Sequence, residues 1–124
     1  MDRAKLEHFE ELLIMKREEE IEQLMDLEKR FGQTQKEASN DLSAYPLHIA
    51  DLATDAETKE TESMLISSYG IMLAEIDRAL KKIYSGEYGK CEKCGKEISE
   101  KRLEAIPWAK LCIKCKREEE ERGL

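Results

Sequence analysis

The spacing of apolar side chains in the first part of the chain predicts a long helix over residues 3–38. Apolar residues recur there three or four positions apart, the spacing of one helix face: Leu6, Phe9, Leu13, Ile21, Leu24, Leu27 and Phe31. Charged residues occupy every position from Lys16 to Glu20 and interrupt this face. Because an isolated core would not tolerate that gap, the pattern indicates a long and partly exposed helix.

A second helix is predicted from about Asp51 to Ser85. Its apolar positions alternate by four and three, which is a heptad seam: Leu65, Tyr69, Met72, Ile76, Ala79 and Ile83. Gly86 and Gly89 follow, and glycine just after a helical segment commonly caps and ends the helix. The connection between the two helices, residues 39–50, is rich in turn formers and helix-capping residues such as Asn40 and Pro46.

A short, turn-rich connection between two long helices favours an antiparallel hairpin within one chain. Each helix would extend roughly 50 Å at about 1.5 Å per residue. The alternative is an oligomeric coiled coil, in which the helices pair between chains. We predict a mainly α fold: a coiled-coil hairpin over residues 1–86 with its tip near 39–56, and a second domain over 87–124. We also expect a monomer.

Four cysteines in the second domain are spaced as zinc ligands. Cys91-x2-Cys94 and Cys112-x2-Cys115 form two matched pairs. Within each pair a tight turn aims both sulfurs at one point, and two pairs complete a tetrahedron of thiolates about 2.3 Å from the metal. Gly95 suits a turn that needs positive φ. A closed sphere has no position for water, so we predict one structural zinc ion and no catalytic metal.

Other states of the cysteines are less favoured. The N-terminus is charged from its second residue and lacks a signal-peptide apolar stretch, and no apolar run approaches a membrane span. We therefore expect a cytoplasmic protein without a membrane segment, in which disulfides are rare. Reduced thiols or a redox Cys-x2-Cys pair are the alternatives, but no βαβ pattern surrounds the cysteines.

The zinc segment, residues 86–116, has too few apolar residues to fold without its metal. These residues form its small predicted core: Ile98, Leu103, Ile106, Trp108, Leu111 and Ile113. Metal binding should therefore supply much of the folding free energy. Trp108 is expected to be the hydrophobic plug of this segment, with stacking on a nucleic-acid base as the alternative.

Charge divides the chain into regions with different partners. The net charge is −7. Residues 1–87 hold 11 Lys/Arg and 20 Asp/Glu, a net of −9, whereas residues 88–117 hold 9 and 4, a net of +5. Phosphates repel the first region, so no direct sequence-specific DNA binding is expected. Residues 115–123 have the charge pattern of a short solvated helix, which ends the chain.

The hairpin tip is acidic and lacks cations. No Lys or Arg occurs from Ala38 to Thr58, and Asp51 and Asp55 lie four apart, so they share one helix face. Such a tip suits contact with a cation-rich site. The alternative is that these acids only stabilise the positive end of the helix dipole. No nucleophile–base pair or phosphate-binding glycine loop stands out, so we predict no enzymatic activity.

The zinc segment resembles that of the DksA/TraR family of bacterial RNA polymerase regulators. The resemblance rests on these residues: Tyr88-Gly89, Cys91-x2-Cys94-Gly95, Ile98, Arg102-Leu103-Glu104-Ala105, Pro107 and Leu111-Cys112-x2-Cys115. It implies a coiled-coil finger that enters the secondary channel of RNA polymerase, with the tip acids near the catalytic magnesium. It also implies that the globular end docks on the channel rim.

The tip departs from the pattern of the best-known family members. They carry Asp-x2-Asp-x-Ala, whereas Asp51-x3-Asp55-Ala56 has one more residue between the acids. His48-x2-Asp51-Leu52 instead resembles a subgroup from Gram-positive bacteria related to general stress and sporulation proteins. We therefore expect a transcription regulator that binds RNA polymerase. The alternative is a zinc-ribbon adaptor that binds another protein or a nucleic acid through its basic segment.

Overall fold

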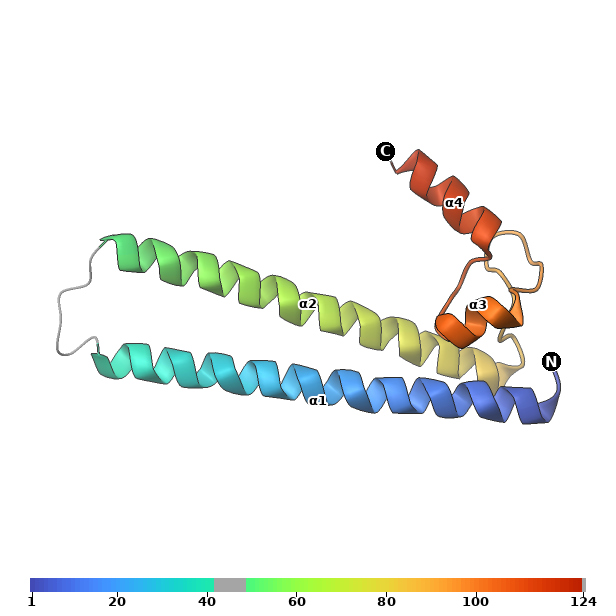
Figure 1. Ribbon diagram of the computed structural model, residues 1–124, viewed down its shortest axis with the longest axis horizontal. Coiled ribbons are helices and arrows are strands. Elements are labelled where there is room, and N and C mark those ends of the chain that lie inside the picture. The colour runs from blue at the N-terminus through green and yellow to red at the C-terminus, as the bar shows by residue number, and fades with distance from the viewer. Residues whose placement is uncertain (42–48, 124) are drawn as a thin grey trace. The chain divides into compact units, whose positions relative to one another are not determined.

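A computed structural model describes the backbone of residues 1–41 and 49–123 and the side chains of residues 1–31 and 58–123. Four helices follow one another along the chain (Figure 1): α1 (Arg3–Asp41), α2 (Ile49–Ser85), α3 (Glu100–Ala105) and α4 (Ile113–Arg122). Within the described residues the only β pairing is an isolated antiparallel bridge between Lys90 and Glu97. The predicted mainly α fold is confirmed.

The chain forms two compact units. The first consists of Met1–Glu18 and Leu73–Leu124, and the second is Glu19–Met72. The long helices α1 and α2 each contribute to both units.

Both long helices exceed their predicted lengths where they face the connection. α1 continues to Asp41 and α2 begins at Ile49, so residues 39–41 and 49–50 are helical instead of being part of the turn. Ser, Asn and Asp cost at most about 0.7 kcal/mol each relative to Ala in a helix. A short run of them therefore does not stop a helix. The rest of the predicted connection lies outside the described residues.

In the first unit, α1 and α2 run antiparallel around an apolar core. The pairs Arg17–Asp77, 2.8 Å apart, and Glu10–Tyr84, 3.3 Å apart, show that one helix rises in number as the other falls. The buried side chains come from both helices: Phe9, Leu13, Ile76, Ala79, Leu80 and Ile83. Figure 1 shows the two segments side by side.

In the second unit the pairing is looser. Tyr69 donates a hydrogen bond to Gln23 over 3.2 Å, and apolar seam residues are only half-buried. The predicted seam position Leu65 is exposed, and Ile66 is half-buried in its place. The prediction was wrong by one position, because two neighbouring apolar residues fit the heptad spacing about equally well in the sequence. The seam that runs through Tyr69 and Ile76 selects Ile66, three residues before Tyr69.

The charged gap in α1 is accommodated without a break in the helix. Arg17 turns to Asp77 on α2, and the Lys16 ammonium lies over the ring of Trp108 at 5.8 Å from its centroid. Glu20 is only 8% exposed. The charges therefore lie partly on the inner side of the helix, where they are held by specific partners.

Candidate metal centre

The first cysteine pair lies on a tight turn closed by the backbone. The Gly95 N–H donates to the Cys91 carbonyl over 3.0 Å, and the Cys91 N–H donates to the Lys96 carbonyl over 2.8 Å. Gly95 has φ +77°, a conformation that side-chain-bearing residues rarely adopt. The positive φ predicted for Gly95 is confirmed.

The second cysteine pair lies at the start of α4. Cys112 is the N-cap residue and Cys115 lies in the first turn, so α4 begins two residues earlier than the predicted helix. The Cys112 sulfur, at the start of the helix, lies among the other cysteine sulfurs.

The short helix α3, which the sequence interpretation missed, supports the site. Ser99 caps it by accepting a hydrogen bond from the Arg102 N–H over 3.2 Å. Ser99 followed by Glu100 was the available signal, since Ser at the cap and an acid in the first turn mark helix starts. Leu103 of α3 is fully buried.

Leu103 takes the place that was predicted for Trp108. The Trp108 ring is half-buried, and Ile113, also assigned to the core, is exposed. Both corrections have one cause: α3 supplies the apolar side chain that fills the centre of the segment. Residues 106–113 then pass around it, with Pro107 and Leu111 buried and Trp108 half-buried.

The four cysteine sulfurs converge on one point. They all lie within 4.8 Å of one another, and those of Cys94 and Cys112 are 3.8 Å apart. Thiolates about 2.3 Å from a tetrahedral zinc ion are separated by about 3.8 Å. Cys91 and Cys115 are buried, whereas Cys94 is exposed. The spacing and the donor set therefore fit a closed zinc site.

Backbone N–H groups of the turns favour the charged form of two of these thiols. Burial raises the pKa of Cys91, but hydrogen bonds from the N–H groups of Cys94, Cys112 and Lys93 outweigh it and lower the value to about 6. A backbone hydrogen bond from Cys115 lowers the pKa of Cys112. Burial and the neighbouring cysteines raise the pKa of Cys115 to about 12. Zinc, when bound, stabilises all four thiolates and cross-links the two turns.

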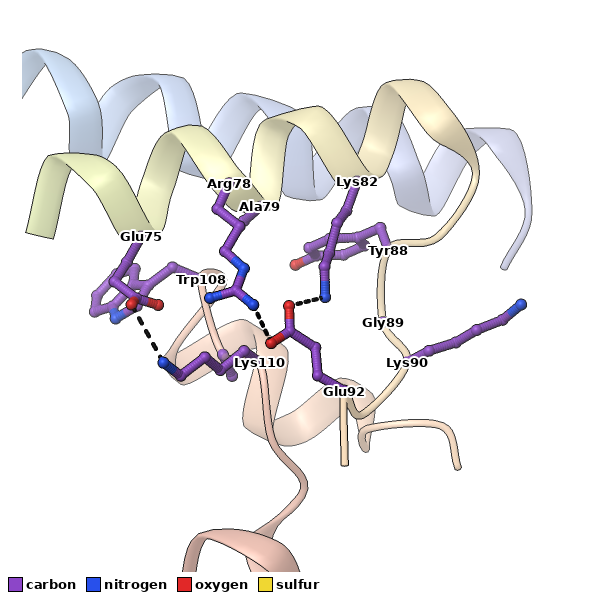
Figure 2. A pocket seen from close by; sticks show the side chains of 11 residues that line it. Glu75, Arg78, Ala79, Lys82, Tyr88, Gly89, Lys90, Glu92, Trp108 and Lys110 are labelled. Atoms are coloured by element: carbon purple, nitrogen blue, oxygen red, sulfur yellow. Dashed lines mark hydrogen bonds and ion pairs between the residues drawn. The ribbon is translucent and has the colours of Figure 1, made fainter. Parts of the chain in front are cut away.

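A carboxylate within the first zinc turn connects it to α2. Glu92, the residue after Cys91, forms ion pairs with Arg78 and with Lys82, the latter over 2.5 Å (Figure 2). Arg78 and Lys82 lie four apart and therefore share one face of α2. We call Glu92, Arg78 and Lys82 the ionic clamp. Burial would raise the pKa of the Glu92 carboxyl, but Lys82 and Arg78 outweigh burial and lower it.

A second set of contacts joins the segment before Cys112 to the same helix. The Lys110 ammonium lies 3.5 Å from the Glu75 carboxylate, as Figure 2 shows. The Lys110 carbonyl also accepts a hydrogen bond from the Glu92 N–H over 2.9 Å. The two zinc-binding segments are thus joined to each other and to α2.

The aromatic side chain of Tyr88 completes this packing. Its hydroxyl donates to the Pro107 carbonyl over 2.8 Å, and its ring centroid lies 5.6 Å from that of Phe9. Burial raises the pKa of Tyr88 well above its ordinary value, so it stays a hydrogen-bond donor. The helix α3 also contacts α1, through the side-chain pairs Lys5–Glu100 and His8–Glu104, each 2.7 Å apart.

The two predicted groups of site residues have different outcomes. The structure brings the four cysteines together. Asp51 and Asp55 lie on the first turns of α2, but their side chains fall outside the described residues. The ionic clamp was not predicted, because no sequence spacing relates Glu92 to cations on the preceding helix.

The fold and the cysteine site together define a four-cysteine zinc finger beside paired long helices. Residues 86–121 match the sequence profile of the prokaryotic dksA/traR C4-type zinc finger. The chain is 35% identical over 117 residues to the RNA polymerase-binding transcription factor DksA of Salmonella typhimurium, covering 94% of this chain and 72% of the relative. It is 30% identical to General stress protein 16O of Bacillus subtilis over 115 residues, 91% of this chain and 66% of that protein.

A solved structure agrees with these relatives. The transcription factor DksA2 from Pseudomonas aeruginosa superposes with a TM-score of 0.77 at 32% sequence identity, covering 99% of this chain and 88% of that one. This chain belongs to the DksA/TraR family. Its cofactor is one structural zinc ion, as the C4 finger and the clustered cysteines require. Among the described helices, none is both long and apolar enough to cross a membrane.

Proposed function

We propose that this protein is a DksA-like transcription regulator that binds RNA polymerase through its secondary channel. The observation that carries the proposal is the relationship along nearly the whole chain to proteins named RNA polymerase-binding transcription factors. The family relationship also supports a regulatory role and not an enzymatic one, as the sequence predicted. The protein would act as a monomer in the cytoplasm, where bacterial RNA polymerase works.

In this proposal Cys91, Cys94, Cys112 and Cys115 hold the zinc ion. Their convergence within 4.8 Å supports the assignment. The metal would do no chemistry, because four protein ligands leave it no open position. It would fix the domain of residues 87–124 beside the helical hairpin of residues 1–86.

The acidic tip is proposed to approach the polymerase active site. Asp51 and Asp55 lie in a stretch without Lys or Arg, and the unit Glu19–Met72 contains 12 Asp/Glu against 4 Lys/Arg, a net of −8. A negative finger is attracted to a channel that leads to bound magnesium. The tip would then perturb the metal or the incoming nucleotide and destabilise initiation complexes.

The second candidate, a zinc-ribbon adaptor, has its own supporting observation. Lys93 and Lys114 occupy matching positions in the two cysteine turns, and each is followed by another lysine, Lys96 and Lys116. All four are exposed. Such a basic surface could bind an acidic protein or a nucleic acid.

In vitro transcription with purified RNA polymerase tests the tip. Asp51→Asn/Asp55→Asn should leave polymerase binding intact and reduce the effect of the protein on transcription. Glu119→Gln/Glu120→Gln in α4 changes the net charge equally and is the matched control. If the Asp51/Asp55 variant affected transcription as much as the wild-type protein does, these acids would serve helix capping alone.

A comparison of polymerase retention with a DNA gel shift separates the two functions. Retention on core polymerase without a shift of free DNA supports the regulator. A DNA shift without polymerase retention would overturn it and favour the adaptor.

A further inference from the structure

The outer face of α1 in the first unit bears exposed apolar side chains surrounded by acids. A shallow hollow is lined by Glu7, Glu10, Glu11, Ile14 and Met15. Ile14 is 38% exposed and Met15 is 61% exposed. In a chain with 40% charged residues, two neighbouring exposed apolar side chains within a hollow are a distinctive feature.

An aromatic side chain from α2 extends this surface. Tyr84 is 67% exposed, and its hydroxyl donates to the Glu10 carboxylate over 3.3 Å. Tyr and Met are enriched at protein interfaces because they offer a large contact area beside a polar or adaptable group. We call Ile14, Met15 and Tyr84, with the rim of Glu7, Glu10 and Glu11, the Tyr84 patch.

Among the described residues, one acid of the rim pairs with a cation, whereas Glu10 and Glu11 form no ion pair. Lys16 lies over the Trp108 ring and Arg17 pairs with Asp77, so both turn toward other partners. Arg3 pairs with Glu7, at the edge of the patch. Glu18 lies seven residues after Glu11 and adds a further exposed acid along the same face. The Tyr84 patch is therefore an apolar surface with a negative border.

We propose that the Tyr84 patch docks a cationic protein segment with an apolar face, such as a basic amphipathic helix. Charge selects this partner among the alternatives. The rim repels nucleic-acid phosphates and anionic membranes. In a two-fold dimer through the patch, its glutamates would face the same glutamates of the second copy, and like-charge contacts of this kind are costly.

This inference rests on the proposed function, because the partner tested is RNA polymerase. It adds a contact surface in the first unit to the proposed action of the tip. The patch would contribute to binding, whereas the tip would contribute to the effect on transcription.

The test measures binding of the full-length zinc-loaded protein to purified core RNA polymerase. Glu10→Lys/Glu11→Lys should weaken binding by about tenfold or more, because it places like charges against a cationic partner. It should also reduce the salt dependence of binding. Glu119→Lys/Glu120→Lys makes the same change in net charge on α4 and should leave affinity within about twofold.

The apolar part is tested separately. Ile14→Ser/Met15→Ser should weaken binding by about tenfold, while Met25→Ser, at another exposed methionine on α1, should not. Apart from the half-buried Glu10, the four variants change exposed side chains, and unchanged thermal melting verifies that they fold. Wild-type affinity in both patch variants would overturn the inference while the regulator function stands. Wild-type protein that fails to bind polymerase would overturn both.

Photocrosslinking identifies what covers the patch. With p-benzoylphenylalanine in place of Tyr84, crosslinks to a polymerase peptide with basic and apolar residues support the inference. Crosslinks to DNA or to a second copy of the chain would overturn it.

Discussion

The two units of this protein bury apolar side chains to different extents. In the unit formed by Met1–Glu18 and Leu73–Leu124, four large apolar side chains are almost completely buried: Phe9, Leu13, Ile76 and Leu103. In the unit Glu19–Met72, the buried residue among the described side chains is Glu20, and the apolar seam is half-buried. In the unit Glu19–Met72 the two helices leave their apolar seam half-buried, whereas the zinc finger supplies a third element to the other unit.

Stability should follow this difference in packing. Segments with few buried apolar contacts open at lower free energy than segments around a core. The unit with the zinc finger should therefore exchange its amide protons more slowly than the unit Glu19–Met72. The metal would then stabilise the part of the chain that is already the better packed.

Removal of a zinc ligand should have the largest effect on stability. It would abolish the difference in packing between the two units. Cys112→Ser should release the metal and expose residues 86–116, because structural zinc contributes about 10–16 kcal/mol of apparent binding energy in small finger peptides. Limited proteolysis and metal analysis measure the outcome. Protease resistance retained without zinc would contradict the folding role of the metal.

Truncation of one leucine in each unit should give unequal losses. Leu103→Ala creates a cavity in the fully buried centre of the zinc finger and should cost about 2–5 kcal/mol. Leu27→Ala, at a half-buried seam position of α1, should cost about half as much or less. Denaturant or thermal unfolding monitored in each unit measures the difference. Equal losses would show that the seam of the second unit is packed as tightly as the core of the first.

The zinc ligands could be found from the sequence because their geometry is local. A Cys-x2-Cys turn brings two sulfurs together regardless of the rest of the fold, and Gly95 marks the turn. The paired helices were predictable for the same reason, because heptad spacing is a local pattern of apolar residues. The confirmed fold class and zinc cofactor both rest on short-range patterns.

The features that were missed depend on the tertiary fold. The choice between Leu65 and Ile66 for the seam needs the position of the facing helix. Trp108 was expected to be the hydrophobic plug of its segment, but Leu103 is the fully buried side chain there once α3 forms. The ionic clamp joins Glu92 to a helix whose exposed charges look like solvated residues in the sequence.

The ionic clamp offers a test of how the zinc finger is attached. Glu92→Gln removes the charge that pairs with Arg78 and Lys82. We expect stability to fall by about 1.5 kcal/mol, because hydrogen bonds to charged groups stabilise a protein more than neutral ones do. This corresponds to roughly tenfold weaker retention of zinc against a chelator. Glu97→Gln in the same loop, which has no ion pair within the described residues, is the control. Equal zinc retention in the two variants would show that the clamp does not support the metal site.

The smallest predicted effects come from two tyrosine hydroxyls, one in each unit. Tyr88→Phe leaves the Pro107 carbonyl without its 2.8 Å donor inside the packed unit and should cost about 1 kcal/mol. Tyr69→Phe removes an exposed 3.2 Å hydrogen bond to Gln23, and water can replace it, so the cost should be only a few tenths of a kcal/mol. Both changes remove one oxygen and keep the ring, so the difference between the two unfolding free energies compares a buried hydrogen bond with an exposed one. If Tyr69→Phe proved as costly as Tyr88→Phe, the second unit would be better shielded from water than its half-buried seam indicates.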